Sequence, residues 1–410
     1  GFQIALPTGR VDMANDPLRL QAEFERELPG ESAHIGAFFR RVSEIDAQVE
    51  EVLELGLRLP PQGLRENFQF RRLVKRFPFL DDEWAIEDPL AEFGHAHPFR
   101  ALINAPYRFC CDMLPARPYP AAFVRVVDGL RKGVFDLDGG PDALPNLFLN
   151  IIRGAGDVRP RARVAQIEIR RGRASHVVLR DRRQTIGCDV LVCNTDPRGF
   201  FQLVPPEQRK DDYHQGIEML QPVYHTFTAS FVVEARAVPE AMARHVFAVA
   251  DLRRPLEEDN LLHISRDAHH IRRTGERQLR TLTASMRVPI SAAMGGPRAV
   301  ERMLEALQAR LSGVVPFLEE HLVARHTPWL RQVAGGEPGA MEIDEEELAP
   351  AYGEALPHTL GTSPTATTTG YRNVLLGSNA AFCGFGSDGP YVAALQMMSQ
   401  VEELVPMKGK

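Results

Sequence analysis

The sequence has no apolar run approaching the ~20 residues of a membrane-spanning helix, and its cysteines show no paired C-x-x-C spacing. Their odd number argues against a disulfide framework, and their spacing argues against a zinc site; we expect no bound metal. Unpaired thiols are typical of a reducing compartment, so we expect a cytoplasmic protein. The five cysteines are Cys110, Cys111, Cys188, Cys193 and Cys383.

A basic excess and the short motifs of several enzyme classes are also missing. The net charge is -6 and the isoelectric point is near 6.1, which argues against a nucleic-acid-binding protein. Neither a G-x-S-x-G elbow nor a P-loop lysine motif occurs, so the sequence lacks the usual motifs of acyl-transfer and phosphoryl-transfer enzymes. The chain starts at Gly1 without an initiator Met or a signal-peptide pattern, and we expect its natural N-terminus to lie upstream.

The bulk composition is that of a soluble globular protein, with 44% apolar and 25% charged residues. The 410 residues exceed the ~250–300 at which a single core stops growing, so we expect two intertwined domains.

Local patterns predict helices and strands along the chain. Residues 2–6 and 10–13 flank a Pro-Thr-Gly turn and predict a β-hairpin. Asp16-Pro17 is a typical helix start, and helical spacing of apolar residues predicts a helix over residues 32–57. Other expected elements are strands at residues 162–169, 174–179, 188–192, 226–233 and 282–288, a helix at 298–323 with a break or a second start at Pro316, and surface loops at 335–369.

Residues 65–80 interleave basic and aromatic side chains, and two interpretations stay open. The segment could lie on a membrane surface, with rings among the headgroups and cations over anionic lipid. Alternatively, it is a helix that faces the core and exposes a solvated basic side. The membrane interpretation would make the protein peripheral on the inner face of a membrane.

The end of the chain carries a strand, a glycine loop and a helix start. Residues 373–377 have the pattern of a buried strand, residues 384–389 read G-F-G-S-D-G, and residues 390–395 open an apolar helix. Free backbone N–H groups at a helix start, next to glycines, suit an anionic group. A dinucleotide fold would need a second strand after this loop, and only residues 401–410 remain. The loop therefore completes a nucleotide site rather than starting one.

Several ordered motifs resemble the phytoene desaturase and carotenoid isomerase group of FAD-dependent oxidoreductases, in the flavin amine oxidase superfamily. Gly139-Gly140 precedes a helix, residues 162–167 read A-R-V-A-Q-I, and residues 188–197 read C-D-V-L-V-C-N-T-D-P. Residues 373–378 read N-V-L-L-G-S and lead to the glycine loop. The order and spacing match the family, and the resemblance extends from Phe2 to the end of the chain.

The resemblance implies an α/β fold: a discontinuous, Rossmann-like FAD-binding domain and a substrate domain built on a second, mixed sheet plus helices. Residues 1–135 would be a mainly helical substrate region that could face a membrane, and residues 206–370 the substrate domain. Residues 136–205 and 371–410 would be the two FAD-binding segments.

The resemblance also implies which residues contact FAD. The backbone of Val164 would meet the adenine, the turn after residue 193 would lie beside the cofactor, and the last helix would face the flavin pyrimidine edge. The dipole of that helix would stabilise charge on reduced flavin. The implied cofactor-binding residues are Gly139, Gly140, Val164, Asn194, Thr195, Asp196, Gly377, Ser378, Gly386, Gly389 and Pro390.

Two departures from the family pattern make FAD binding conditional. The N-terminal G-x-G-x-x-G unit, on the order of 80–100 residues, does not precede Gly1, and Ser378 replaces the expected carboxylate. Three explanations stay open: the chain is the remainder of a full flavoprotein, a second polypeptide supplies the missing unit, or the chain is a degenerate homologue.

The expected function is hydride transfer between flavin and a long apolar, polyisoprenoid or carotenoid-like substrate, with dehydrogenation, isomerisation and saturation all open. No catalytic residue is identified, because flavin chemistry does not require a protein base. Tyr224 and His225 are candidates for lining the substrate site, with packing in the core as the alternative. For His95 and His97 a capping or surface role is favoured over metal binding. The rival hypothesis is a non-catalytic subunit that uses the flavin fold as an interaction scaffold.

Overall fold

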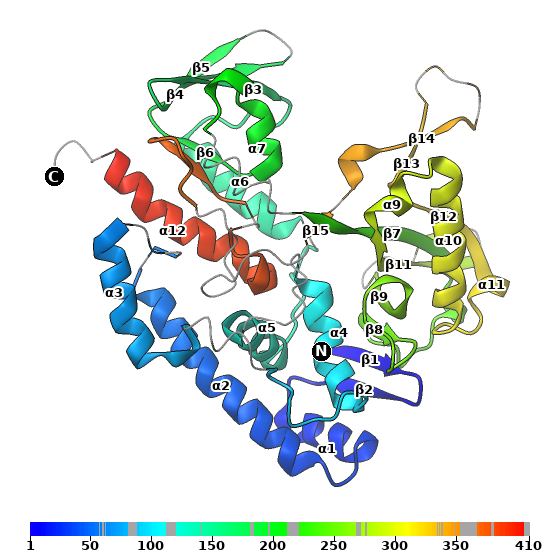
Figure 1. Ribbon diagram of the computed structural model, residues 1–410. Coiled ribbons are helices and arrows are strands. Elements are labelled where there is room, and N and C mark those ends of the chain that lie inside the picture. The colour runs from blue at the N-terminus through cyan, green and yellow to red at the C-terminus, as the bar shows by residue number, and fades with distance from the viewer. Residues whose placement is uncertain are drawn as a thin grey trace. The chain divides into compact units, whose positions relative to one another are not determined.

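The computed structural model describes residues 1–56, 58–59, 61, 63–80, 88–111, 120–140, 142–180, 184–195, 197–210, 221–267, 272–274, 277–333, 335, 337, 339–348, 350–352, 367–378 and 381–405. The chain divides into two compact units, and each is described by itself (Figure 1). Unit 1 comprises Gly1–Ala47, Ala85–Gly133 and Gln221–Glu354. Unit 2 comprises Gln48–Trp84, Val134–Leu220 and Ala355–Lys410.

Unit 1 is built on a nine-stranded mixed sheet with the order β12-β7-β11-β9-β8-β1-β2, to which β10 and β15 add at β11 and β7. The β1 and β8 strands pair in parallel, and the other pairings are antiparallel. The strands are β1 (Phe2–Leu6), β2 (Gly9–Met13), β7 (Pro222–Glu234), β8 (His245–Val249), β9 (Leu261–Arg266), β10 (Arg272–Thr274), β11 (Arg277–Pro289), β12 (Leu322–His326) and β15 (Pro350–Tyr352). A separate hairpin joins β13 (Leu330–Gln332) and β14 (Met341–Ile343).

Alternation along the two longest strands places the core of unit 1 on one face of the sheet. Every second residue from Phe227 to Val233 on β7 is buried, and so is every second residue from Leu282 to Val288 on β11. The helix α10 (Pro297–Ser312) buries Val300, Leu304, Leu307 and Leu311 in the same cluster. These residues recur every three or four positions, which is the spacing of one helix face.

The remaining helices of unit 1 begin at sequence signals that are local. Asp16 caps α1, because its carboxylate accepts a hydrogen bond from the Arg19 amide at 2.8 Å and Pro17 occupies the first turn. The helices are α1 (Pro17–Glu27), α2 (Ser32–Glu54, which continues into unit 2), α4 (Pro98–Cys110), α5 (Pro120–Lys132), α9 (Ile290–Ala293) and α11 (Leu318–His321), with 3-10 turns η4 (Ala235–Ala237), η5 (Glu258–Asn260) and η6 (Glu345–Glu347).

Unit 2 holds an antiparallel sheet, β3-β4-β5, and a parallel pair, β6 and β16. Arg171 and Gly172 connect β3 to β4 with φ values of 52° and 73°, as a tight hairpin turn requires. The strands are β3 (Val164–Arg170), β4 (Arg173–Leu179), β5 (Thr185–Gly187), β6 (Leu191–Cys193) and β16 (Val374–Leu376). The helices are α3 (Gly63–Arg76), α6 (Ala143–Ala155), α7 (Pro197–Leu203) and α12 (Gly389–Leu404), with 3-10 turns η1 (Pro78–Leu80), η3 (Pro206–Gln208) and η9 (Cys383–Asp388).

The α6 helix exposes its apolar face. Leu147, Phe148, Ile151 and Ile152 recur at helical spacing, and each is about half exposed or more. Isolated domains rarely present a contiguous apolar face of this kind to water.

The segment over residues 65–80 forms α3 and η1. Phe68 is 58% exposed, and the Arg72 guanidinium lies 4.5 Å from the centre of its ring. Phe77, Phe79 and Leu80 are buried. The aromatic residues thus divide between the solvent and the core, and the membrane interpretation stays a prediction. Within the described residues, none of the helices has the length and hydropathy needed to cross a bilayer.

Three of the boundaries predicted from the sequence are wrong. The strand expected at 188–192 is interrupted between β5 and β6, because the Asp189 carbonyl accepts a hydrogen bond from the Asn373 amide. Of the helix expected at 298–323, the first part ends at Ser312 and a second helix, α11, starts at Leu318, shortly after Pro316 as predicted, but residues 322–326 form β12, which pairs with β7. The region expected to form loops, 335–369, contains β14 and β15.

Candidate functional site

The candidate site of unit 2 lies where its two parallel strands end. Val374, Leu375 and Leu376 on β16 are in register with Leu191, Val192 and Cys193 on β6. The Gly377 amide donates to the Cys193 carbonyl at 2.8 Å and extends the pairing by one residue. Residues 194–195 and 377–378 therefore leave the pair at the same edge. The carboxyl edge of a parallel sheet is where α/β folds bind ligands.

Asn373 ties this edge to the antiparallel sheet. Its side-chain oxygen accepts from the Ala174 amide at 2.8 Å, and its nitrogen donates to the carbonyls of Ala174 at 2.9 Å and Asp189 at 2.8 Å. Asn373 is 1% exposed, so these hydrogen bonds are shielded from water. One side chain thereby connects β16, β4 and the turn before β6.

Two buried hydroxyls at the edge have no hydrogen-bond partner among the described residues. They are Thr195 Oγ1, two residues after β6, and Ser378 Oγ, two residues after β16. Leaving a buried hydroxyl unpaired costs about 1–3 kcal/mol, so such groups call for a partner. A hydroxyl can both donate and accept, which suits a polyhydroxylated ligand such as the ribityl chain of FAD.

The glycine loop is the 3-10 turn η9. It is anchored by Phe382 and Phe385, which are buried and stack with ring centroids 5.8 Å apart. Gly386 has φ 55° and ψ -130°, a conformation that a residue with a Cβ reaches only with strain. The loop thus presents bare backbone directly before α12.

The start of α12 offers fewer free amides than the sequence predicts. The Gly389 amide donates to the Gly386 carbonyl, and Pro390 has no amide hydrogen. The Asp388 side chain makes no capping hydrogen bond. Among the described first-turn residues, Tyr391 is left to offer an N–H group, together with the positive end of the helix dipole.

Gly377 brings α12 against the strand pair. A Cβ at this position would lie 2.1 Å from the Met397 Cε atom, so the Met397 side chain occupies the space that glycine leaves. Burial, followed by the neighbouring Cys188 thiol, raises the pKa of Cys193 to about 12. Cys193 is therefore a packed thiol beside the site.

The other predicted cofactor residues of unit 2 occupy separate places. Val164 begins β3 and packs against the cluster that contains Cys193, Val374 and Leu376. Gly139 and Gly140 have positive φ and precede α6, and the described contacts do not join them to the strand pair. Asp196 lies outside the described residues.

Tyr224 and His225 belong to unit 1, on β7 between β11 and β15. His225 packs edge-on against Trp329, with ring centroids 5.7 Å apart. Burial and the Glu257 and Glu258 carboxylates raise the pKa of the Tyr224 phenol. The structure gives His225 a packing contact and sets Tyr224 near charged side chains; their substrate-lining role stays a prediction.

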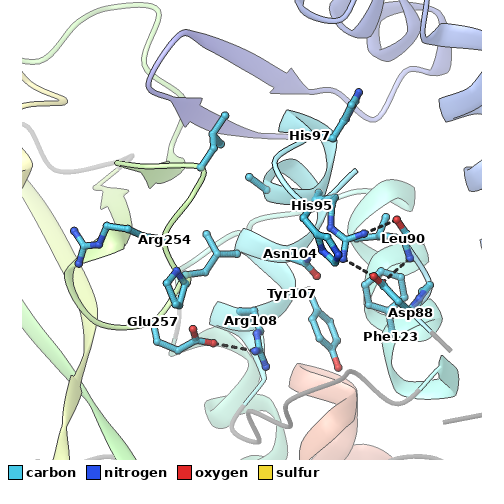
Figure 2. Close-up of a pocket in the computed structure, with 16 residues that line it drawn as sticks. Asp88, Leu90, His95, His97, Asn104, Tyr107, Arg108, Phe123, Arg254 and Glu257 are labelled. Atoms are coloured by element: carbon cyan, nitrogen blue, oxygen red, sulfur yellow. Dashed lines mark hydrogen bonds and ion pairs between the residues drawn. The ribbon is translucent and has the colours of Figure 1, made fainter. Parts of the chain in front are cut away.

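One of those charged side chains, Glu257, lines a cavity of about 520 Å³ in unit 1 (Figure 2). Arg100, Asn104 and Arg108 follow one another at single turns of α4 and face it. Arg100 pairs with Asp88, and Arg108 pairs with Glu257 at 3.0 Å. His95 and His97 both line this cavity, and the ring nitrogen of His97 also caps α4 by accepting from the Phe99 amide at 3.2 Å. The predicted capping role of His97 is confirmed.

Sequence reasoning missed Asn373 as a site-building residue and Asn104 as a cavity residue. An asparagine directly before a run of apolar strand residues is the signal that could have identified Asn373, because a buried amide needs partners. The alignment of Arg100, Asn104 and Arg108 on one helix face was also readable.

Comparisons with known proteins identify the fold. Protein-family models and curated protein sequences give no match. A triple mutant of putrescine oxidase, from a redesign of cofactor binding, matches 98% of this chain and 81% of its own at 14% identity and a TM-score of 0.50. Cyclohexylamine oxidase from Brevibacterium oxydans matches 98% of this chain and 80% of its own at 13% identity and a TM-score of 0.45.

An oxidoreductase from Methanosarcina mazei matches 73% of this chain at 14% identity and a TM-score of 0.49, and the match spans 64% of that protein's length. At such identities the likeness to putrescine oxidase shows the fold alone. It confirms the predicted fold class, an α/β fold with a second, mixed sheet and helices.

Proposed function

We propose that the protein is a FAD-dependent oxidoreductase that holds its flavin cofactor at the carboxyl edge of β6 and β16. The observation that carries the proposal is the pair of buried hydroxyls, Thr195 Oγ1 and Ser378 Oγ, without partners among the described residues. The fold shared with putrescine oxidase supports it, and so does the order of the motifs that resemble the flavin-dependent desaturases.

The residues at this edge fit such a cofactor. Thr195 and Ser378 would hydrogen-bond its hydroxyl groups, with Ser378 taking the place of a carboxylate. Gly386 would let the ligand approach the backbone, and the start of α12 would stabilise negative charge near Gly389 and Pro390. Bound FAD supplies the hydride chemistry. Asn373 contributes by keeping the edge rigid, since its hydrogen bonds are made within the protein.

Variants of the two hydroxyls test the proposal because the two possible roles predict different results. A structural role predicts a loss of stability, whereas a cofactor-binding role predicts weaker FAD binding without a loss of stability. In Thr195→Val and Ser378→Ala, the unfolding free energy without cofactor stays level or rises by about 1 kcal/mol, since an unpaired buried group is removed. The FAD dissociation constant of the native-length protein rises about tenfold for each, which corresponds to one lost hydrogen bond of about 1.4 kcal/mol. Flavin fluorescence titration and urea unfolding measure the two quantities.

Thr369→Val is the matched control in unit 2. The Thr369 hydroxyl donates to the Val374 carbonyl at 2.7 Å and accepts from the Tyr371 amide at 3.1 Å. Its loss lowers stability by about 1–2 kcal/mol and leaves FAD affinity unchanged. The proposal fails if the Thr195 and Ser378 variants lose stability as Thr369→Val does while binding FAD normally.

For the substrate we propose a long apolar molecule of polyisoprenoid or carotenoid type, on the strength of the resemblance of residues 139–197 and 373–390. Anaerobic addition of a polyene hydrocarbon to the flavin-loaded protein is expected to bleach the flavin absorbance, whereas putrescine leaves it unchanged. Bleaching by the amine and not by the polyene would contradict this substrate class.

A further inference from the structure

Unit 1 contains a second cavity, of about 390 Å³, at the end of its core. It lies against the paired strands β1 and β8, beside the C-terminal end of α10 and the segment around Met242. Its volume is within the ~300–1,000 Å³ of small-molecule sites. The cavity is separate from the cavity of Figure 2, because the two share no lining residue among those described.

The wall of this cavity is apolar. Met242, Val246, Ala248 and Val249 line it and are each at most 6% exposed. Gln3 also lines it, but both ends of its amide already bind the backbone: the nitrogen donates to the Ala241 carbonyl at 2.8 Å and the oxygen accepts from the Ala243 amide at 2.7 Å. The interior therefore offers apolar contacts to a ligand, and few uncharged groups that could hydrogen-bond to it.

The charged residues that line the cavity are both arginines, Arg10 and Arg310, and the described lining includes no carboxylate. In the cavity of Figure 2, by contrast, Arg100 and Arg108 are each paired with a lining carboxylate. The Asp259 carboxylate, near Arg310, forms its ion pair with Arg254 at 2.5 Å. Positive charge at an apolar cavity without a lining carboxylate favours an anion.

Arg310 retains most of its hydrogen-bonding capacity. Its Nε–H donates to the Asp259 carbonyl at 2.9 Å. A guanidinium has five N–H groups, and the other four of Arg310 make no hydrogen bond to the described residues. Burial lowers the pKa of Arg310, so the charged form is incompletely compensated. A carboxylate in the cavity would supply that compensation with charge-assisted hydrogen bonds.

We propose that the β1–β8–α10 cavity binds a free aliphatic or aromatic carboxylate, with the apolar body against Val246, Ala248 and Met242 and the carboxylate on Arg310. Arg10, whose guanidinium lies 3.5 Å from Asp12, adds positive charge at the exposed rim. The helix dipole of α10 places about half a negative charge nearby, which the full charge of Arg310 outweighs. The site is independent of the proposed flavin chemistry.

Isothermal titration calorimetry of the full chain with hexanoate, octanoate, decanoate and octanol tests the proposal. Affinity is expected to rise about threefold to fourfold for each added methylene until the cavity is filled, and octanoate should bind at least about tenfold more tightly than octanol. Arg310→Gln is expected to lower octanoate affinity about tenfold or more and to leave octanol binding unchanged, which also shows that the cavity is intact.

Two further variants make the outcome decisive. Arg302→Gln, on the exposed side of the same helix, should bind octanoate like the unaltered protein. Val314→Trp, which fills the cavity from its half-buried wall, should abolish binding of both ligands. The proposal is overturned if octanoate does not bind, if octanol binds equally well, or if Arg302→Gln weakens octanoate as much as Arg310→Gln.

Discussion

Replacing Asn373 by alanine is expected to lower the free energy of unfolding by about 4 kcal/mol. The substitution removes three buried hydrogen bonds of about 1 kcal/mol each and leaves the Ala174 amide and carbonyl without these partners. It also weakens the connection between the antiparallel sheet and the strand pair, because the lost bonds span 199 and 184 residues of sequence, although the Arg372 amide still donates to the Gly172 carbonyl at 2.9 Å. Urea unfolding followed by circular dichroism measures the change.

Two companion variants identify the cause. Asn373→Asp retains the acceptor for the Ala174 amide, loses both donor bonds and adds a buried charge, so it should be at least as destabilising as two lost bonds, about 2 kcal/mol or more. Asn194→Ala, at an exposed position of the same edge, should change stability by less than about 0.5 kcal/mol. A loss below about 1 kcal/mol for Asn373→Ala would mean that Asn373 does not tie the sheets together.

Acidification is expected to destabilise the protein through His263, on β9. Burial, and next the neighbouring His245, lowers the pKa of His263 to about 3. The His245 and His263 rings stack at 5.5 Å between centroids, and the Phe109 and Phe247 rings lie 4.4 and 4.9 Å from His263. The phenylalanine rings are apolar, and His245 Nδ1 lies 3.3 Å from His263 Nε2. None of these rings provides a counter-charge for a histidinium.

The direction of this pH effect on stability follows from the number of protons that the folded and unfolded states bind. The unfolded state, with a histidine pKa near 6.5, takes up a proton between about pH 6.5 and 3, whereas folded His263 stays neutral. The contribution of His263 is therefore fully present above pH 6.5 and is lost on acidification, at up to about 1.4 kcal/mol per pH unit. Between pH 6.5 and 4.5 the loss is about 2–3 kcal/mol.

His263→Phe should remove this slope, because phenylalanine fits an aromatic environment and does not titrate. The unfolding free energy of the variant and of the unaltered protein is measured against pH, and the two slopes are compared. Carboxylates contribute equally to both slopes, so the difference reports on His263. His326→Phe, at an exposed position on β12 of the same sheet, should keep the original slope. An unchanged slope in His263→Phe would show that His263 is accessible to protons in the folded state.

What the sequence predicts correctly is local. The Pro-Thr-Gly hairpin and the Asp16 cap depend on residues within a few positions, so they can be identified without the fold. The burial of β16 followed from an unbroken apolar run after Asn373.

What it misses depends on contacts that are distant in sequence. The break after Gly187 arises from the Asn373 amide, and residues 322–326 become a strand because they pair with β7 about ninety residues earlier. Likewise, Thr195 and Ser378 could be selected by resemblance, but only the pairing of β6 with β16 brings their hydroxyls to one buried edge. The stacked pair His245 and His263 has no sequence signature, since the residues meet diagonally across β8 and β9.

The visible absorbance spectrum of the complete native protein tests the central claim most directly. We expect flavin absorbance bands in the purified protein and their release into the supernatant on denaturation, with less flavin retained by the Thr195→Val, Ser378→Ala double variant than by the Thr369→Val control. A colourless full-length protein that takes up no FAD on incubation would contradict a flavin site at the edge of β6 and β16.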